Sequence, residues 1–541
     1  MWYGIVFSRE IMKKNKKQYS KNRRPIDAIK SPSTRASLKR LRALNHGIYT
    51  SNGNNYNNAV FGRDSIISAR ELLTSKPEIS REVILTIASL QGTKFRKISA
   101  EEPGKIHHEN REFKTWHARY LKKLLMPLVS LLWGGNTRYM TTYFTADATP
   151  MYISLVAEYA EIEPSILDEE VTRNDDKIVT IRQTMYDAVE YTTRNISANG
   201  LIRATRPNPF SLVNCTWKDS PTGYIHKNGR VAHFTKPMFY LQVQVFSVDA
   251  LRQASDVIKA TDPELSKEWL ETSNKLAHKT LDSFWLKDKN FFGSFIDHPT
   301  KNKYRLSRVL QSDPFWMLNS SIFDGLDKSK RHTYIESIVK SIFSDDFLTD
   351  AGIRCRALSE ASDYTGGDYH GSLATWPIDT YITAKGLKRQ GMVKLAEQLE
   401  SRVINSTNVA VDYYEFFFVL KDGSIIMKPE DKFHKNSKFP KLPVFMFPDS
   451  DIAWSVVTAY MIKHGEDEHK TKYPKLSSWG VGLETEILSE IDRIKTYMTN
   501  KQVSGDDNLE PEVRLSQPLG IWRTTSKVIR DSAFNYFENV K

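Results

Sequence analysis

Apolar residues recur at helical spacing in many successive segments of this chain, whereas strand-like alternation is rare. In one such segment Tyr152, Leu155, Val156 and Tyr159 share a single helix face. The clearest strand-like run is Tyr413–Leu420. A chain of this kind buries its apolar faces by packing helix on helix, so we predict an all-α fold. The predicted helices cover residues 59–75, 80–91, 118–134, 147–162, 177–195, 237–256, 263–285, 331–343, 377–390, 392–405, 452–464 and 484–498.

Clusters of polar and aromatic residues stand immediately before several of these helices. They lie at Phe61–Asp64, Tyr143–Pro150, Tyr369–Asp379 and Asp449–Ser455. Asp caps a helix and Pro suits its first turn, which explains part of each cluster but not the Trp, His and Arg residues. If successive helix pairs form a ring, alternate helix starts meet at one rim. We therefore expect a site built at that rim from distant segments.

Positive charge is concentrated near the N-terminus. Of a formal net charge of +13, Arg9–Arg42 contributes thirteen Lys or Arg residues against only Glu10 and Asp27. Such runs are typical of solvated tails, although they can also contact phosphates non-specifically. We predict a flexible basic arm over residues 1–45 and one folded domain over residues 46–541. Nucleic acid is not an expected partner, apart from non-specific contact through the arm.

Several classes of protein are disfavoured. Met1–Phe7 is apolar but short and precedes the basic residues, which is the wrong order for a secretory signal. No later run approaches the roughly 20 apolar residues of a membrane helix, and two cysteines are too few for a disulfide framework. These features favour a cytoplasmic protein with no membrane partner. Phosphate-binding Gly-rich loops, HExxH, paired CxxC and Gly-x-Ser-x-Gly motifs are missing, so we expect no metal and no cofactor.

Two carboxylates have unusual surroundings. Asp219 lies in the segment Asn214–Ser220, two residues after Trp217 and just before a Gly-bearing loop. Aromatic neighbours can desolvate a carboxyl group and raise its pKa, which suits a general acid; local sequence alone favours an ordinary turn residue. Glu415 interrupts the aromatic run Tyr413–Phe418. A buried charge there is costly unless paired or functional, but in a strand the side chain could equally face outward.

Six short motifs occur in a fixed order between Asn58 and Lys463. They are Phe61–Asp64, Glu101–Arg111, Asp147–Pro150, Trp217–Ser220, Tyr369–Asp379 and the segment around Glu415. Their order resembles the catalytic domain of glycogen debranching enzymes of the amylo-α-1,6-glucosidase type, which belong to the six-hairpin glycosidases. This resemblance implies an (α/α)6 toroid with short β-hairpins and long rim loops, in which residues 46–541 form the catalytic domain.

The resemblance also implies an activity and a set of site residues. It implies inverting hydrolysis by two carboxylates, with Asp219 as general acid and Glu415 as general base. The implied substrate is a non-reducing-end sugar, α-glucosidically linked, of an oligosaccharide or glucan. The substrate-binding residues that we predict are Arg63, Asp64, Asp147, Trp217, Lys218, His370, Trp376 and Asp379.

Some positions depart from the family pattern. Gln242 replaces a carboxylate, Ile452 replaces an amide, and the neighbours of Glu415 differ from those in the family. These differences leave open a non-catalytic carbohydrate-binding relative. Six-hairpin hydrolases of trehalose, mannosylglycerate or another small glycoside are further alternatives. Glu360 and Asp412 are substitute candidates for the second carboxylate.

Overall fold

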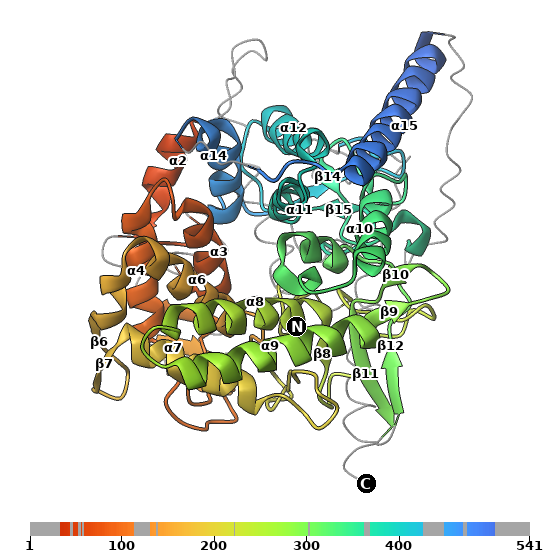
Figure 1. Ribbon diagram of the computed structural model, residues 1–541. Coiled ribbons are helices and arrows are strands. Elements are labelled where there is room, and N and C mark those ends of the chain that lie inside the picture. Colours follow the sequence, from red (N-terminus) through yellow and green to blue (C-terminus); the bar gives the residue numbers. More distant parts are fainter. Residues whose placement is uncertain are drawn as a thin grey trace.

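The computed structural model describes most of the chain. The described residues are 33–43, 47–51, 56, 59–112, 130–136, 139–220, 222–300, 303–361, 368–425, 448–468 and 473–503. Their colours in Figure 1 run in sequence order around a ring, from red on the left through green at the bottom to blue at the top. At the end of this circuit α14 (Ala453–Glu468) lies beside α2 (Thr34–Leu41).

An inner ring of helices surrounds the centre of the fold. Its members are α3 (Gly62–Leu72), α6 (Ala148–Ile162), α8 (Leu241–Ile258), the 3-10 helix η3 (Asp313–Asn319), α11 (Pro377–Arg389) and α14. Each member contacts the next in this order, and α14 contacts α3, so the ring is closed. Because neighbours cover both sides of these helices, most residues of α3, α6 and α11 are buried.

Each inner helix carries an outer partner. The outer helices are α4 (Pro77–Ser89), α7 (Ile181–Arg194), α9 (Pro263–Phe284), α10 (Lys328–Ile342), α12 (Val393–Ala410) and α2. The first five pack on the inner helix that precedes them, and α2 packs on α14. In α9 the buried positions, including Trp269, Leu276 and Phe284, form one stripe because the other side faces water. The described residues therefore form an (α/α)6 toroid, as predicted.

Short antiparallel strands precede several inner helices. The strands are β1 (Arg42–Ala43), β2 (Gly47–Ile48), β3 (Val60–Phe61), β4 (Glu109–Glu112), β5 (Tyr139–Thr142), β6 (Glu170–Thr172), β7 (Ile178–Thr180), β8 (Phe239–Tyr240), β9 (Trp285–Leu286), β10 (Phe291–Phe292), β11 (Phe295–Thr300), β12 (Lys303–Leu306), β13 (Leu348–Thr349), β14 (Gly352–Ile353), β15 (Ala374–Thr375) and β16 (Phe417–Phe418). They pair as β1-β2, β3-β4-β5, β6-β7, β8-β11-β12, β9-β10, β13-β14 and β15-β16.

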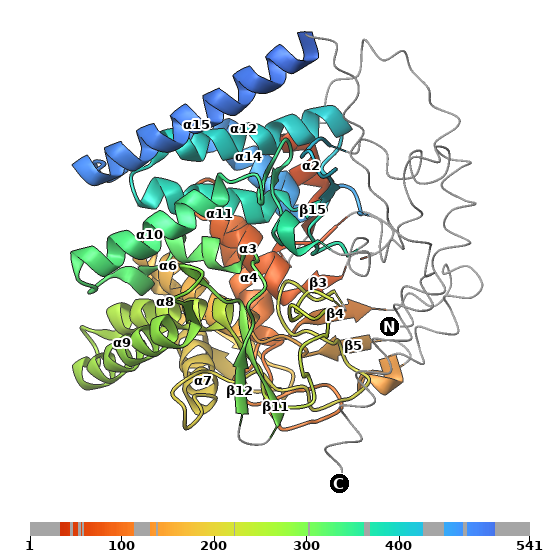
Figure 2. The same ribbon diagram turned by 90° about the vertical axis from the view of Figure 1, so that its right-hand side faces the viewer.

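These strands mark the rim where inner helices begin. β3 runs directly into α3, and β8 runs directly into α8. Figure 2 shows β3, β4, β5 and β15 on the same side of the helical body. At this rim Arg63, in the first turn of α3, lies 3.5 Å from Asp147, the N-cap residue of α6. The predicted meeting of helix starts is confirmed for these two helices.

Most predicted helices match the structure, but one outer helix and one inner 3-10 helix were not predicted. These are α2, which lies within the predicted arm, and η3, which is too short to show helical periodicity. The predicted strand Tyr413–Leu420 contains only the two-residue β16. The predicted helix at 118–134 lies largely outside the described residues. The remaining elements are η2 (Pro164–Asp168), η4 (Ser321–Phe323), η5 (Leu358–Glu360) and α15 (Ser478–Val503).

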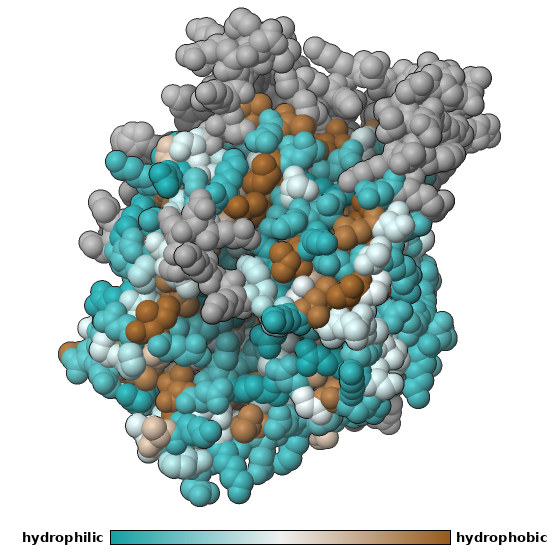
Figure 3. Space-filling model, turned by 45° about the horizontal axis from the view of Figure 1, so that its top comes forward, coloured by the Kyte–Doolittle hydropathy of each residue, from teal (hydrophilic) through white to brown (hydrophobic). Residues whose placement is uncertain are grey.

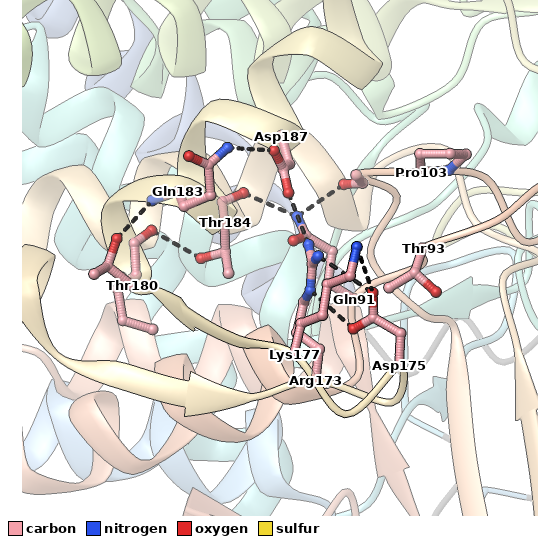
Figure 4. Close-up of polar contacts among 12 residues, drawn as sticks. Gln91, Thr93, Pro103, Arg173, Asp175, Lys177, Thr180, Gln183, Thr184 and Asp187 are labelled. Atoms are coloured by element: carbon pink, nitrogen blue, oxygen red, sulfur yellow. Dashed lines mark hydrogen bonds and ion pairs between the residues drawn. The ribbon is translucent and has the colours of Figure 1, made fainter.

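The Glu101–Arg111 motif begins with a loop that lies against the outer helix α7 (Figure 4). Gln91 Nε2 donates hydrogen bonds to the carbonyl oxygens of Gly104 (3.1 Å) and Thr184 (2.9 Å), the latter in α7. Gly104 has a φ of +81°, and a Cβ atom there would lie 2.0 Å from the carbonyl oxygen of Asp187. Glycine is therefore required for close packing of this loop on α7.

The face of the described residues drawn in Figure 3 is predominantly hydrophilic. On the face drawn in Figure 3, apolar residues form separate small areas among hydrophilic ones. None of the helices in the described part of the chain combines the length and the apolar character needed to cross a membrane.

Helix α2 corrects the predicted boundary of the arm. Its Leu38 and Leu41 are buried, and Arg40 lies 2.6 Å from Asp451, just before α14. The folded domain therefore begins before residue 46, because α2 supplies the outer partner of α14. Residues 1–32 lie outside the described residues, so the flexibility of that part of the arm stays a prediction.

A pair of N-terminal deletions tests the role of α2. Removing residues 1–43 uncovers the apolar side of α14 and deletes two buried leucines, each of which contributes about 1.5–3 kcal/mol. We expect this variant to unfold at a clearly lower Tm by circular dichroism. Deletion of residues 1–32 is the matched control and should leave Tm unchanged. Equal Tm values for the two deletions would contradict the packing role of α2.

Candidate active site

Arg63 stands among three carboxylates contributed by different segments. Its Nε lies 3.8 Å from Asp64 Oδ2, its Nη1 3.5 Å from Asp147 Oδ2 and its Nη2 3.9 Å from Asp219 Oδ2. Arg63, Asp64 and Asp147 are all buried, whereas the Asp219 side chain is 27% exposed. One guanidinium group therefore gathers the acidic groups of two helix starts and of the loop that precedes α8.

Part of this cluster has unused hydrogen-bonding capacity. Arg63 Nε and Asp64 Oδ2 are buried and have no hydrogen-bond partner among the described residues. Burial raises the pKa of Asp64 to about 6, although the charge of Arg63 opposes the shift. Buried polar atoms without partners are rare because they forfeit hydrogen bonds to water. Atoms of this kind can bind the hydroxyl groups of a ligand.

Asp219 has the properties of a proton donor. Its Oδ1 accepts a hydrogen bond of 3.2 Å from the Tyr369 hydroxyl. Burial raises the pKa of Asp219 to about 6, while Arg63 and the Tyr369 hydrogen bond act in the opposite direction. A carboxyl group with this pKa exchanges its proton close to neutral pH, as a general acid must.

Glu415 lies deeper in the same cluster. It is 2% exposed, and its Oε1 accepts a hydrogen bond of 2.6 Å from the Tyr56 hydroxyl. Burial raises the pKa of Glu415 well above its ordinary value, and Asp449, Asp64 and Asp219 raise it further by repulsion. Tyr369, the donor to Asp219, stacks on Phe416, the residue after Glu415, with ring centroids 5.8 Å apart, so the two carboxylates lie on neighbouring segments.

Two tyrosines connect these carboxylates. Tyr369 donates to Asp219, and its own pKa is raised by burial and by the charges of Asp219, Asp368 and Glu415. Tyr56 donates to Glu415, and its pKa is raised by burial and by Glu415, Asp219 and Asp64. Each hydroxyl therefore remains protonated and available as a donor at neutral pH.

Three aromatic rings, those of His370, Trp376 and Phe416, pack around Tyr369. The ring of Trp376 stacks with those of His370 (centroids 4.7 Å apart) and Phe416 (5.2 Å). Burial lowers the pKa of His370 well below its ordinary value, so its ring is neutral and offers one donor and one acceptor. Neither ring nitrogen of His370 has a hydrogen-bond partner in the described part of the chain. His370 can therefore bind a ligand hydroxyl.

The rings of Trp217 and Trp376, which we predicted to stack on a sugar, pack against protein side chains instead. Trp217 is 1% exposed, stacks on Trp316 with centroids 5.5 Å apart, and donates its indole N–H to Gln242 Oε1 at 2.6 Å. Trp376 is 2% exposed between aromatic neighbours and donates to the carbonyl oxygen of Tyr369 at 2.6 Å. Both rings pack against other aromatic rings, and both indole N–H groups donate hydrogen bonds within the protein. These contacts hold the loops that carry Asp219 and Tyr369 in place.

The side chains of Lys218 and Asp379, which we predicted to contact the substrate, are bonded to protein groups instead. Lys218 Nζ donates to Asp313 Oδ2 (2.6 Å), Ser312 Oγ (3.0 Å) and the carbonyl oxygen of Cys355 (3.0 Å), which uses all three of its donors. The Asp379 oxygens accept from Ser312 (2.6 Å) and Trp316 (2.5 Å). Both side chains are fully buried and form a polar network that supports the cluster.

The two substitute carboxylates have other partners. Glu360 forms an ion pair of 2.6 Å with Lys227. The pKa of Asp412 is raised by burial, and the charges acting most strongly on it are those of Asp451, Arg40 and Asp449. Glu415 therefore fits the cluster better than either substitute.

Neither Tyr56 nor Tyr369 was among the predicted site residues. Tyr369 lies within a quoted motif, but nothing in its spacing indicated a contact with Asp219. Tyr56 is the single aromatic residue of an Asn-rich stretch just before Phe61, and that isolation is the only signal that could have found it. Its partner Glu415 is distant in sequence, so the contact depends on closure of the ring.

The described residues contain no group of three or more His, Cys, Asp or Glu side chains arranged to hold a metal ion. The cluster consists instead of carboxylates around one arginine, with two tyrosine hydroxyls and a neutral histidine. Such a set can bind hydroxyl groups and exchange protons.

A closed ring of six helix pairs defines the (α/α)6 class of fold. In this chain the acidic cluster lies at one rim of the ring. No protein family model matches the chain, and no curated protein matches it. The structure is similar to a GH63 mannosylglycerate hydrolase from Thermus thermophilus in complex with glucose, with a TM-score of 0.50 and 12% identity over 80% of this chain and 100% of that one. The same hydrolase in complex with Tris gives a TM-score of 0.50 and 13% identity, with the same coverage.

An uncharacterized conserved protein from Thermus thermophilus is also similar, with a TM-score of 0.50 and 12% identity over 80% of this chain and 98% of that one. At these identities the likeness shows the fold alone. The resemblance to glycogen debranching enzymes stays a prediction.

Replacing Lys218 tests the buried network. Lys218→Met should destabilise the protein by about 3–5 kcal/mol, because it leaves the Asp313 carboxylate buried without its cation. Chemical denaturation measures this loss. The matched control Lys275→Met, at an 80% exposed side chain, should change stability by less than about 1 kcal/mol. Similar stabilities for the two variants would contradict the structural role of Lys218.

Proposed function

We propose that this protein is an inverting glycoside hydrolase that removes a non-reducing-end sugar, with Asp219 as general acid and Glu415 as general base. The observation that carries this proposal is geometric: Tyr369, which donates to Asp219, stacks on Phe416 with ring centroids 5.8 Å apart, and Phe416 directly follows Glu415 in the chain. This hydrolysis requires two carboxyl groups, one that acts as general acid and one that acts as general base.

The reaction assigns a separate proton transfer to each carboxyl group. Asp219 donates its proton to the glycosidic oxygen as the bond to the anomeric carbon breaks. Glu415 accepts a proton from a water molecule that attacks the same carbon from the opposite face, so the product has the inverted configuration. The anomeric carbon of the sugar becomes bonded to the oxygen of the water molecule, and the glycosidic oxygen stays on the aglycone with the proton from Asp219.

Differences in burial support an orientation for the substrate. Asp219 is the exposed member of the pair, whereas Glu415, Arg63, Asp64 and Asp147 are each 5% exposed or less. The leaving group therefore lies on the Asp219 side, and the terminal sugar is enclosed. Unpartnered atoms of Arg63 and Asp64 bind its hydroxyl groups.

The resemblance noted in the sequence supports a terminal α-glucosidic residue of an oligosaccharide or glucan as the substrate. A small glycoside is the second candidate. It is favoured by the enclosed cluster and by the mannosylglycerate hydrolase that has a similar fold and is covered over its full length. A panel of aryl glycosides, disaccharides, mannosylglycerate and branched glucan separates these candidates by their relative kcat/KM.

Variants of both carboxylates test the proposal. We expect Asp219→Asn and Glu415→Gln each to lower kcat on the best substrate of the panel by at least about 10²–10⁴-fold, because each removes a proton transfer. NMR of the first product should show the inverted anomer. Asp288→Asn, at a 62% exposed side chain, is the matched control and should retain full activity.

Two outcomes would reject the hydrolase proposal. One is parental turnover in both carboxylate variants. The other is a parent that binds sugar but hydrolyses nothing in the panel, which would support the non-catalytic alternative.

The pH dependence supplies an independent test. Asp219 must carry a proton to act as an acid, and its pKa is raised to about 6. We therefore expect kcat/KM to fall as the pH rises above about 6, tenfold per unit on the alkaline limb. Initial rates measured at low substrate concentration between pH 4 and 9 would show this limb. Full activity retained to pH 9 would contradict the assigned role of Asp219.

A further inference from the structure

The two oxygens of Glu415 have different surroundings. Oε1 accepts the hydrogen bond from Tyr56 at 2.6 Å, whereas Oε2 is buried and has no hydrogen-bond partner among the residues that the structure describes. We propose that Tyr56 is a positioning residue whose hydroxyl holds Oε1 of Glu415, so that Oε2 is the atom that takes the proton from the attacking water. This inference rests on the proposed function, in which Glu415 is the base.

Ser51, which precedes Tyr56 in the chain, contacts the segment that is hydrogen-bonded to Glu415. Ser51 forms a β-bridge with Ile452, at the start of α14, and its hydroxyl donates to Asp449 Oδ2 at 3.1 Å. The carbonyl oxygen of the same Asp449 accepts the backbone N–H of Glu415 at 3.0 Å. Asp449 therefore accepts hydrogen bonds from both Ser51 and Glu415.

The ring of Tyr56 is held from the other side. It packs edge to face on Phe61, with centroids 5.3 Å apart, and Phe61 packs in the same way on His108. The carbonyl oxygen of Tyr56 accepts the backbone N–H of Ala59 at 2.9 Å. Because ring and backbone are both held, Tyr56 presents its hydroxyl to Glu415 in one orientation.

The negative charges near Glu415 make the hydrogen bond from the Tyr56 hydroxyl important for its ionisation. The other ionisable groups that act on Glu415 are Asp449, Asp64 and Asp219, and all three disfavour its negative charge. Tyr369 is also close enough for the charge of Glu415 to raise the pKa of its phenol. A base must be ionised before it can accept a proton, and the Tyr56 hydroxyl is the donor that stabilises the ionised form of Glu415.

Tyr369 provides a matched comparison on the other carboxylate. Its hydroxyl donates to Asp219, which is otherwise acted on by Arg63, Asp147 and Asp64. Removal of either hydroxyl should raise the pKa of the carboxyl group that it serves. The kinetic effects differ because Glu415 must be deprotonated and Asp219 must be protonated. Loss of the Tyr56 hydroxyl should therefore lower kcat/KM on the acidic side of the pH profile, and loss of the Tyr369 hydroxyl should extend activity on the alkaline side.

The experiment is a pH profile of kcat/KM for the full-length Tyr56→Phe variant. We expect its acidic limb to move upward by about one pH unit, with about tenfold lower kcat/KM below the limb, because the ionised Glu415 has lost its donor. The loss should fall on kcat, with KM changed by less than about threefold, since Tyr56 acts on the base. Thermal unfolding checks that the variant is folded.

Two tyrosine variants serve as controls. Tyr369→Phe should move the alkaline limb upward and leave the acidic limb in place. Tyr139→Phe, at a 54% exposed side chain remote from Glu415 in sequence, should leave both limbs in place. Replacement of Tyr56 by 3-fluorotyrosine keeps the shape of the ring and strengthens its hydroxyl as a donor. It should move the acidic limb to lower pH, and it replaces the Phe variant if that variant does not fold.

The outcomes separate the two proposals. A parent that is active, a Glu415→Gln variant that is inactive and a Tyr56→Phe variant with an unchanged acidic limb would overturn the role of Tyr56 alone. An acidic limb that is unmoved by 3-fluorotyrosine would do the same. Turnover that survives Glu415→Gln would instead overturn the proposed function, whatever the behaviour of Tyr56.

Discussion

The placement of one buried arginine among carboxylates organises this molecule. Asp64, Asp147 and Asp219 could not share a desolvated rim without a cation, because each would repel the others and take up a proton. Arg63 faces all three, yet none of the three distances is shorter than 3.5 Å. The ring brings α3, α6 and the loop before α8 to this one side chain. Loosely paired charges of this kind remain available to a ligand.

The sequence was sufficient for elements whose apolar pattern is long. α6, α8 and α9 follow the helical period over many residues, so their existence and approximate bounds were predictable. η3 was not predictable, because Asp313–Asn319 is too short to show a period and becomes helical between α8 and α11. α2 was missed for a different reason. Its positive charges resemble those of a solvated tail, and only the two buried leucines reveal its packing.

The site was predicted in part, and the failures share one cause. Motif resemblance found Arg63, Asp64, Asp147, Asp219 and Glu415, which the structure gathers. The same motifs contain Lys218, whose order beside Asp219 in the chain suggested a ligand contact. Neighbouring side chains in a loop point in different directions, and Lys218 turns into the core toward Asp313. Tyr56 is the opposite case, a site residue that was not predicted. Its hydrogen bond to Glu415 joins two distant segments that no local sequence pattern connects.

Closure of the ring has a consequence for biosynthesis. The last helix pair joins α14 from the C-terminal part of the domain to α2 from the N-terminal part. During translation α2 emerges early and must wait for its partner until nearly the whole domain has been made. Contacts between such distant segments form slowly because a long loop must close first. Glu415 and Tyr56 come from the same two parts of the domain, so a nascent chain completes their contact only late in its synthesis.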